Sequence, residues 1–240
     1  MPAPPAASDL VIPASPGSQR VLSNAQVASI RAWWGRAMAG RVRVQLFVDG
    51  AGCDACEVTS RVLQQLQTAT DKLQVSVQLA AQARGAGEAF ERLPETRVVM
   101  SNGNVVRFFG TQVGVEVTSL VQTIADASLP SAPLPPDAVK GARALAPGSW
   151  LRVFVGPACT HCPGAVRAAV ALAHANPRLA VEVVSTSEFP ELARAFKVAA
   201  VPTTVVNGRA FFEDPRSPLD VLEALHAAPP LGAAGAPGSA

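Results

Sequence analysis

Residues 151–166 read LRVFVGPACTHCPGAV and combine three features in a fixed order. The apolar run 151–155 is typical of a buried strand, and a short loop follows it. The pair Cys159 and Cys162 comes next and opens segment 162–175, whose apolar spacing predicts a helix. A strand, a loop and a CxxC pair before a helix predict a reactive thiol at the start of that helix.

The same arrangement occurs once before in the chain. The apolar run 42–48 ends just before Cys53, and apolar residues at helical spacing follow Cys56. The chain has four cysteines, so each one belongs to a CxxC pair. The first cysteines of the two pairs are 106 residues apart, which is about the length of one small domain.

Further landmarks repeat at nearly the same distance. Pro94 and Pro202 are 108 residues apart, and the turn dipeptides Asn102-Gly103 and Asn207-Gly208 are 105 apart. Each turn dipeptide lies between two strand-like runs, which predicts a hairpin. Each half therefore runs through strand, helix, strand, short helix, hairpin and helix, and the last helix of the first half is predicted over 116–127. A capping box at Ser23 to Gln26 predicts a further helix before the first strand. We predict an α/β fold class in which each half is a central mixed β-sheet flanked by helices.

Proline-rich and alanine-rich stretches mark the domain limits. Residues 1–20 and 229–240 lack apolar periodicity and are predicted to be disordered tails. Four prolines between Ser128 and Pro136 mark a boundary between the halves. The expected division is an N-terminal domain over 21–128, a linker over 129–147 and a C-terminal domain over 148–228.

Composition excludes several classes of protein. The 240 residues are 49% hydrophobic and 16% charged with a net charge of +2, and no basic run suggests nucleic acid or a membrane surface. No apolar run reaches the roughly 18 residues that a membrane span needs. The start, Met1 to Pro5, lacks the basic and apolar regions of a secretory leader, so a cytoplasmic location is expected. Disulfides in that compartment are usually transient and catalytic.

The spacing within a CxxC pair suits thiol–disulfide exchange. The first cysteine would be exposed, and the second, one helical turn in, could attack a mixed disulfide and release the substrate. Structural zinc is the alternative, because two CxxC pairs can form a four-cysteine site if the halves bring them together. His161 could donate to the Cys159 thiolate and make the disulfide more oxidising. It could instead be a solvated histidine at the start of the helix.

The two prolines follow Leu93 and Val201. A cis bond before Pro202 would present the backbone of Val201 beside the CxxC pair, where it could pair with an extended substrate segment. Only about 5–6% of X-Pro bonds are cis, but Pro94 occupies the matching place in the first half. We therefore expect Val201 and Pro202, and likewise Leu93 and Pro94, to bind substrate.

Four segments resemble the tandem-thioredoxin-fold protein disulfide oxidoreductases, often called glutaredoxin-like. They are residues 42–56, 104–110 (NVVRFFG), 151–166 and 196–207 (FKVAAVPTTVVN), and the likeness extends over about residues 25–228. The resemblance implies two tandem thioredoxin-like folds with redox-active disulfides Cys53–Cys56 and Cys159–Cys162. It also implies that Pro94 and Pro202 are cis prolines.

One position departs from the pattern of the wider family. Thioredoxin carries a buried acid near its CxxC pair, but the residue six places before Cys159 is Val153, and the one before Cys53 is Phe47. The sequence therefore leaves the proton acceptor for the second cysteine unidentified.

The predicted function is that of an enzyme, a thiol–disulfide oxidoreductase that reduces, forms or isomerises protein disulfides. The alternatives are an electron carrier dedicated to a peroxiredoxin-type partner and a non-enzymatic adaptor built from thioredoxin folds. No glycine-rich dinucleotide motif occurs, so we expect no cofactor, and electrons would come from an external reductase or glutathione. No metal is expected at either site.

Overall fold

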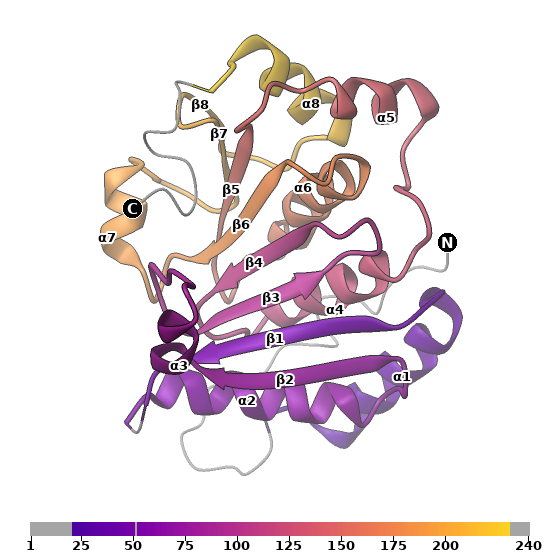
Figure 1. Cartoon of the computed structure of the whole chain (residues 1–240), viewed down its shortest axis with the longest axis vertical. Coiled ribbons are helices and arrows are strands. Elements are labelled where there is room, and N and C mark those ends of the chain that lie inside the picture. The colour runs from indigo at the N-terminus through magenta and orange to yellow at the C-terminus, as the bar shows by residue number, and fades with distance from the viewer. Residues whose placement is uncertain (1–20, 51, 231–240) are drawn as a thin grey trace.

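One eight-stranded sheet runs through both halves of the chain (Figure 1). The structure is a computed structural model that describes residues 21–50 and 52–230. The strands are β1 (Val42–Val48), β2 (Leu73–Leu79), β3 (Glu95–Val99), β4 (Val105–Phe109), β5 (Trp150–Val155), β6 (Ala180–Ser185), β7 (Thr203–Val206) and β8 (Ala210–Phe212). The helices of the described residues are α1 (Asn24–Ala37), α2 (Asp54–Gln67), α3 (Ala80–Gly85), α4 (Glu116–Ala127), α5 (Pro136–Arg143), α6 (Cys162–Ala175), α7 (Pro190–Ala195) and α8 (Pro218–Ala227).

The strand order shows one unit built twice. The order is β2-β1-β3-β4-β6-β5-β7-β8, so each half supplies four neighbouring strands. In the first half β1 is parallel to β2 and antiparallel to β3; in the second, β5 is parallel to β6 and antiparallel to β7. The predicted α/β class with a mixed sheet in each half is confirmed.

The sheets of the two units are joined edge to edge, which the repeat in the sequence does not predict. Strand β4 of the first unit pairs in parallel with β6 of the second, with Val106 opposite Val181 and Phe109 opposite Val184. Each of these strands would otherwise leave its backbone N–H and C=O groups unpaired at an edge. Joining the edges satisfies those groups and makes the sheet continuous.

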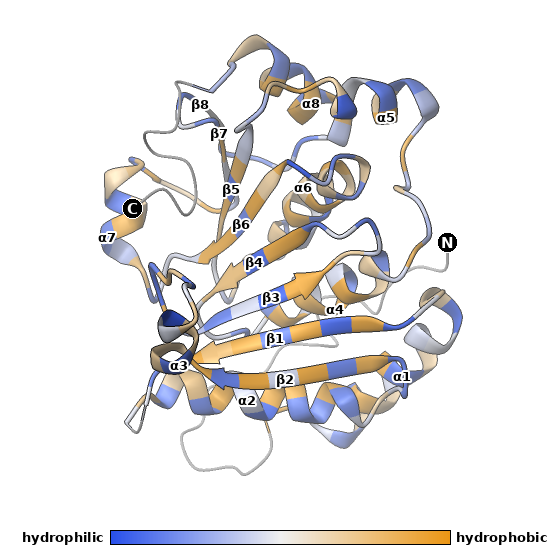
Figure 2. Cartoon of the chain, viewed as in Figure 1, coloured by the Kyte–Doolittle hydropathy of each residue, from blue (hydrophilic) through white to orange (hydrophobic). Residues whose placement is uncertain are grey.

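Helices cover the two faces of the sheet unequally. In the view of Figure 1, α1, α2, α4 and α6 lie behind the sheet, whereas α3 and α7 lie at its left-hand side. The larger core lies under the first group of helices and includes Trp34, Phe108 and Val153. A smaller one under α7 includes Trp150 and Phe154. In Figure 2 the strands are largely orange, with blue bands along β1 and β2.

A second contact joins the units at the end of the sheet where the β3–β4 turn lies. The side-chain amide of Asn104 donates to the carbonyls of Ala173, Asn176 and Leu179, at 3.1, 3.1 and 2.9 Å. These carbonyls lie at the end of α6 and in the turn before β6, where helix carbonyls lack intrahelical partners. The hairpin of the first unit thus caps a helix of the second.

Several local predictions hold, and one segment differs. The capping box is present at α1, where the Ser23 hydroxyl accepts from the Gln26 N–H at 3.2 Å. Segment 129–147, predicted to be a linker, contains α5, because Pro136 suits the first turn of a helix. Its buried Ala138 and Ala142 belong to the larger core. The predicted tails lie outside the described residues, except for 229 and 230. Among the described helices, none is long and apolar enough to span a membrane.

Candidate active sites

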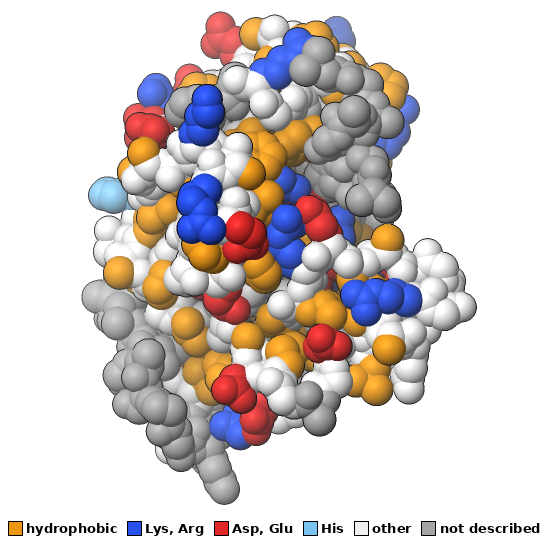
Figure 3. Space-filling view, turned by 90° about the vertical axis from the view of Figure 1, so that its left-hand side faces the viewer, with side chains coloured by type: hydrophobic (Ala, Val, Ile, Leu, Met, Phe, Trp, Pro, Cys, Tyr) orange, Lys and Arg blue, Asp and Glu red, His pale blue; other side chains and the backbone are white. Residues whose placement is uncertain are grey.

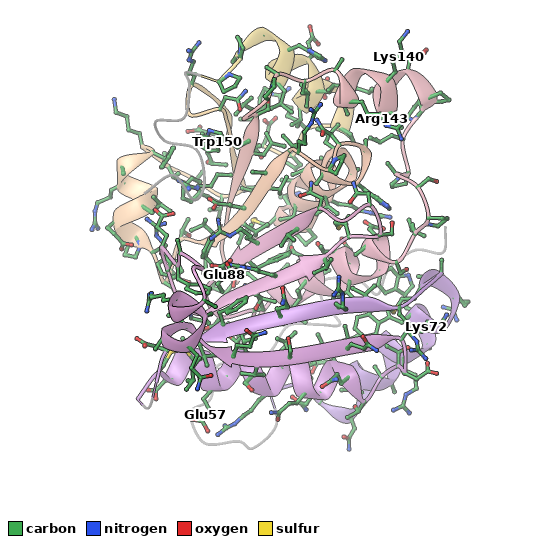
Figure 4. The ribbon with its side chains drawn as sticks, viewed as in Figure 1. Glu57, Lys72, Glu88, Lys140, Arg143 and Trp150 are labelled. Carbon is green, nitrogen blue, oxygen red and sulfur yellow. A yellow bond between two sulfur atoms is a disulfide. The ribbon has the colours of Figure 1, made fainter. Side chains whose placement is uncertain are left out.

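The first candidate site lies at the end of β1. Cys53 is the N-cap of α2, and its sulfur accepts from the backbone N–H of Cys56 at 3.2 Å. The two cysteines form a disulfide, with Cys53 partly exposed and Cys56 5% exposed. Asp54 and Glu57 lie in the first turn of the helix, and both are exposed. Glu57, labelled in Figure 4, forms an ion pair with Arg61.

The second candidate site lies at the end of β5 and differs in its helix start. Cys159 and Cys162 form a disulfide, with Cys159 partly exposed and Cys162 1% exposed. Helix α6 begins at Cys162 itself, with His161 at the N-cap and Pro163 in the first turn. Residues 159–162 instead form a turn in which the Cys162 N–H bonds the Cys159 carbonyl at 3.3 Å. The expected placement at a helix start therefore holds for Cys53 and is wrong for Cys159, since Pro163 sets the first turn further along.

A proline loop leads into the strand next to each site, since β3 neighbours β1 and β7 neighbours β5. The Leu93–Pro94 and Val201–Pro202 bonds are both cis, as expected. Pro94 and Pro202 are buried, whereas Leu93 and Val201 are partly exposed. A Cβ atom placed on Gly156 would lie 3.4 Å from Cγ2 of Val201, so Val201 packs against the loop that leads to Cys159.

Both CxxC pairs lie at the same end of the sheet. Strands β1 and β5 point in the same direction, because the chain of pairings from β1 through β3, β4 and β6 to β5 reverses direction twice. Three strands lie between them. The zinc alternative required the two pairs to meet; the structure instead closes each into its own disulfide and keeps them three strands apart. Figure 3 views the molecule from the side at which β1 and β2 end.

A segment of the first unit crosses from one site to the other. The Gly110 N–H donates to the Pro94 carbonyl at 3.0 Å, and the Val115 N–H donates to the Pro157 carbonyl at 2.9 Å. Between them, Gly114 has a φ of 58°, and a Cβ there would lie 2.4 Å from the Pro157 oxygen. Only glycine suits this close approach. Segment 110–115 therefore connects the proline loop of the first site to the CxxC loop of the second.

A buried acid follows this segment directly, next to the residue that contacts the loop before Cys159. Glu116, 1% exposed, follows Val115 directly, and its Oε1 accepts from the Ser185 hydroxyl at 3.0 Å. Ser185 lies opposite Val155, the last residue of the strand that leads to Cys159. Burial raises the pKa of Glu116 to about 8; the Ser185 hydrogen bond opposes this rise, and the charge of Glu188 adds to it. Its Oε2 is buried without a hydrogen-bond partner among the described residues.

Sequence reasoning missed Glu116 for a physical reason. The residue opens the predicted helix 116–127, where an acid ordinarily stabilises the helix start and faces solvent. It belongs to the first unit, whereas the loop at Pro157, which its neighbour Val115 contacts, belongs to the second. Only the pairing of β4 with β6 brings Glu116 and that loop together, and no local pattern in the sequence predicts this pairing.

His161 is exposed, and its side chain does not cap α6. A positive imidazole beside Cys159 would still favour the thiolate, so His161→Ala should make the Cys159–Cys162 disulfide less oxidising. A tenfold change in the exchange constant corresponds to a shift of about 30 mV in reduction potential, and we expect a shift of at least about a third of that size. Equilibration with glutathione measures it. His226→Ala, which removes an exposed histidine of α8, is the matched control. Equal potentials in the two variants would assign His161 to the solvated surface.

The comparisons with known proteins agree with this geometry. A family model described as "Thioredoxin domain" matches residues 151–213. A thioredoxin from Methanocaldococcus jannaschii is 36% identical over 63 residues, which are 26% of this chain and 74% of that protein. Both matches are to single thioredoxin units, about a quarter of the chain.

Two solved structures extend the likeness over both units. A protein disulfide oxidoreductase from Aeropyrum pernix has a TM-score of 0.76 and 25% identity, covering 86% of this chain and 94% of its own. The NTD_N/C domain of alkylhydroperoxide reductase AhpF from Enterococcus faecalis has a TM-score of 0.75 and 24% identity, covering 85% and 99%. The prediction of two tandem thioredoxin-like folds is confirmed. The chain belongs to the thioredoxin family, and within it to the oxidoreductases that carry two such folds in one chain.

Proposed function

We propose that this oxidoreductase exchanges disulfides with protein substrates through both CxxC sites. One observation supports this most directly. In each pair the first cysteine is partly exposed and the second is buried, and a cis-proline loop leads into the neighbouring strand. This is the arrangement that exchange needs, because the exposed thiolate attacks and the buried one resolves.

The reaction in the reducing direction begins with the dithiol. The Cys159 thiolate attacks one sulfur of a substrate disulfide, forms a mixed disulfide and releases the other substrate sulfur as a thiolate. Cys162 loses its proton, attacks the sulfur of Cys159 and releases the second substrate thiolate. The chain is left with the Cys159–Cys162 disulfide, and two electrons have passed to the substrate. Cys53 and Cys56 would take the same roles in the first site.

Glu116 is the residue we propose to accept the proton from Cys162. A pKa of about 8 lies near the ordinary thiol value of about 8.5, so transfer between the two groups is nearly balanced. The first unit would then supply the acid that the second lacks, since position 153 is the buried Val153. The return step, in which the disulfide is reduced again, would use the same carboxyl as the donor.

The remaining partners are also proposals. An external reductase or glutathione would return the electrons, and the cytoplasm is the compartment in which transient CxxC disulfides are usual. Val201 and Leu93 would offer their backbone to an extended substrate segment.

The test is reduction of insulin disulfides with dithiothreitol as the electron source. The chain should accelerate the reaction, and a variant with serine at all four cysteines should return it to the uncatalysed rate. Equal rates with and without the cysteines would overturn the proposal. If insulin is untouched but a peroxiredoxin is reduced, the dedicated electron carrier replaces the general oxidoreductase.

A further inference from the structure

A row of charged side chains crosses the middle of the sheet on the face opposite α1, α2, α4 and α6. The register places Arg97 opposite Arg107, Arg107 opposite Glu182, and Glu182 opposite Arg152. Glu95 lies two residues before Arg97 on β3, and alternate residues of a strand share a face. Figure 4 labels Glu88 and Trp150, which contact the outer members of the row, Arg97 and Arg152.

Glu95 is one of two fully enclosed members of this row. Its side chain is 0% exposed, as is that of Glu182. Its Oε1 accepts from Nε of Arg97 at 2.6 Å and from Nε of Arg107 at 2.8 Å, and its Oε2 accepts from Nη2 of Arg107 at 3.1 Å. Arg107 thus holds both carboxylate oxygens at once, which fixes orientation as well as charge. A buried carboxylate without such a partner would be strongly disfavoured.

Arg107 also reaches the second unit. Its Nη1 donates to Oε1 of Glu182 at 3.2 Å, and Oε2 of Glu182 accepts from Arg152 at 2.6 and 2.8 Å. Burial opposes the charge on Arg107, but the hydrogen bond to Glu95 and the charges of Glu95 and Glu182 outweigh it and raise its pKa. One guanidinium therefore contacts a buried carboxylate of each unit.

Glu95 directly follows Pro94, the proline of the first site. Two contacts anchor this segment. The Pro94 carbonyl accepts from the N–H of Gly110, just after β4, at 3.0 Å, and the Glu95 side chain accepts from Arg107 of β4. The corresponding residue of the second unit, Thr203, bonds locally, with its hydroxyl on the Ala200 carbonyl at 2.6 Å. The proline loop of the first site therefore depends on a charge that the second unit helps to hold.

We propose that Arg107 is a positioning residue for the first CxxC site, where its hold on Glu95 sets the Leu93–Pro94 segment beside Cys53 for peptide binding. The proposal rests on the proposed function, because it assigns a substrate segment to that site. It also makes Glu182, a residue of the second unit, a contributor to recognition at the first. A purely structural ion pair would instead affect folding without distinguishing between substrates.

The test uses a protein whose one remaining thiol is Cys53, with serine at Cys56, Cys159 and Cys162. The rate at which this thiol attacks a peptide carrying an activated mixed disulfide is compared with its rate on a small symmetrical aromatic disulfide. The small reagent needs no peptide groove. Arg107→Met should lower the peptide rate on the order of tenfold, because a shifted loop misplaces the substrate, while the rate with the small disulfide stays within about twofold.

Two further variants complete the design. Arg107→Lys keeps a charge beside Glu95 and should recover part of the peptide rate, and Glu182→Gln should lower that rate in the same direction by a smaller factor. Arg43→Met is the control, since Arg43 is an exposed arginine on β1 that lies two residues from Gln45, the neighbour of Arg97. Circular dichroism checks that each variant folds.

Three outcomes would overturn the inference. The first is an equal loss of rate with both reagents in Arg107→Met. The second is an unchanged ratio of the peptide rate to the small-disulfide rate in that variant. The third is a single-thiol protein, without further substitution, that reacts no faster with the peptide than with the small disulfide. If Arg107→Met lowers the peptide rate but Glu182→Gln leaves it unchanged, peptide recognition at the first site does not depend on the second unit. The insulin assay decides the proposed function separately, because the single-thiol rates require no turnover.

Discussion

Cys159→Ser should abolish most of the insulin reductase activity of the chain, whereas Cys53→Ser should leave more than half of it. The second site has uncharged Thr160 and exposed His161 within its motif, and buried Glu116 nearby. The first has exposed Asp54 and Glu57 in the opening turn of α2, and nearby anions disfavour a thiolate. The N-cap position of Cys53 favours the thiolate, but those two acids share the same helix start and oppose it.

The measurement is the initial rate of insulin reduction with dithiothreitol for each single variant. A fall of about tenfold or more for Cys159→Ser corresponds to about 1.4 kcal/mol or more of lost transition-state stabilisation. Asp54→Asn is the matched variant. Removing this anion should make the Cys53–Cys56 disulfide more oxidising and bring its reduction potential closer to that of the Cys159–Cys162 disulfide. Equal losses from Cys159→Ser and Cys53→Ser would contradict the ranking of the two sites.

The second large effect is expected for Glu116→Gln, which should slow the resolving step at the second site by about a hundredfold if the carboxyl accepts the proton of Cys162. The pH profile of the unmodified chain should show an ionisation near 8, which the variant should lack. The amide keeps the size and the contact with Ser185 but cannot accept a proton. Single-turnover release of the mixed disulfide measures the resolving step directly.

The same substitution should change how stability depends on pH. In the folded chain the pKa of Glu116 is about 8 against an ordinary value of 4.5, so between those values the folded state holds a proton that the unfolded state has lost. Glu116 therefore stabilises the fold fully below pH 4.5, and this contribution falls by about 1.4 kcal/mol per pH unit as the pH rises toward 8.

Denaturant unfolding at pH 5 and pH 8 checks this. The difference in unfolding free energy between the two pH values should be smaller in Glu116→Gln than in the unmodified chain. Glu57→Gln, which neutralises an exposed acid, is the control and should leave that difference unchanged. A Glu116→Gln chain with the unmodified pH dependence and full activity would show that this carboxyl takes no part in proton transfer.

Short-range patterns predicted most of each unit. The helix predicted over 116–127 is α4 with the same limits, and the turn at Asn102-Gly103 joins β3 to β4. Ser23 forms the capping box expected of it. These features depend on neighbours three or four residues away, which the sequence displays directly. The repeat spacing then extends the prediction from one unit to two.

Long-range features could not be predicted in the same way. The pairing of β4 with β6, the place of Glu116 and the contacts of Arg107 depend on how two units meet, and neither periodicity nor spacing encodes that meeting. Glu95 and Glu182 illustrate the point. Both carboxylates are buried in the sheet. Glu95 is bound by Arg97 of its own strand and by Arg107 of β4. Glu182 is bound by Arg152 of its own unit and by Arg107 of the other unit.

The continuous sheet limits how electrons can move within one chain. Four strand-to-strand steps of about 4.8 Å separate β1 from β5, or roughly 19 Å, and nucleophilic attack requires that two sulfurs touch. Backbone hydrogen bonds across every step leave no hinge along which one site could swing to the other. The two pairs therefore act as separate stores of two electrons each. A fully reduced chain can deliver four, and any equalisation between its halves must pass through a diffusing thiol or a second molecule of the protein.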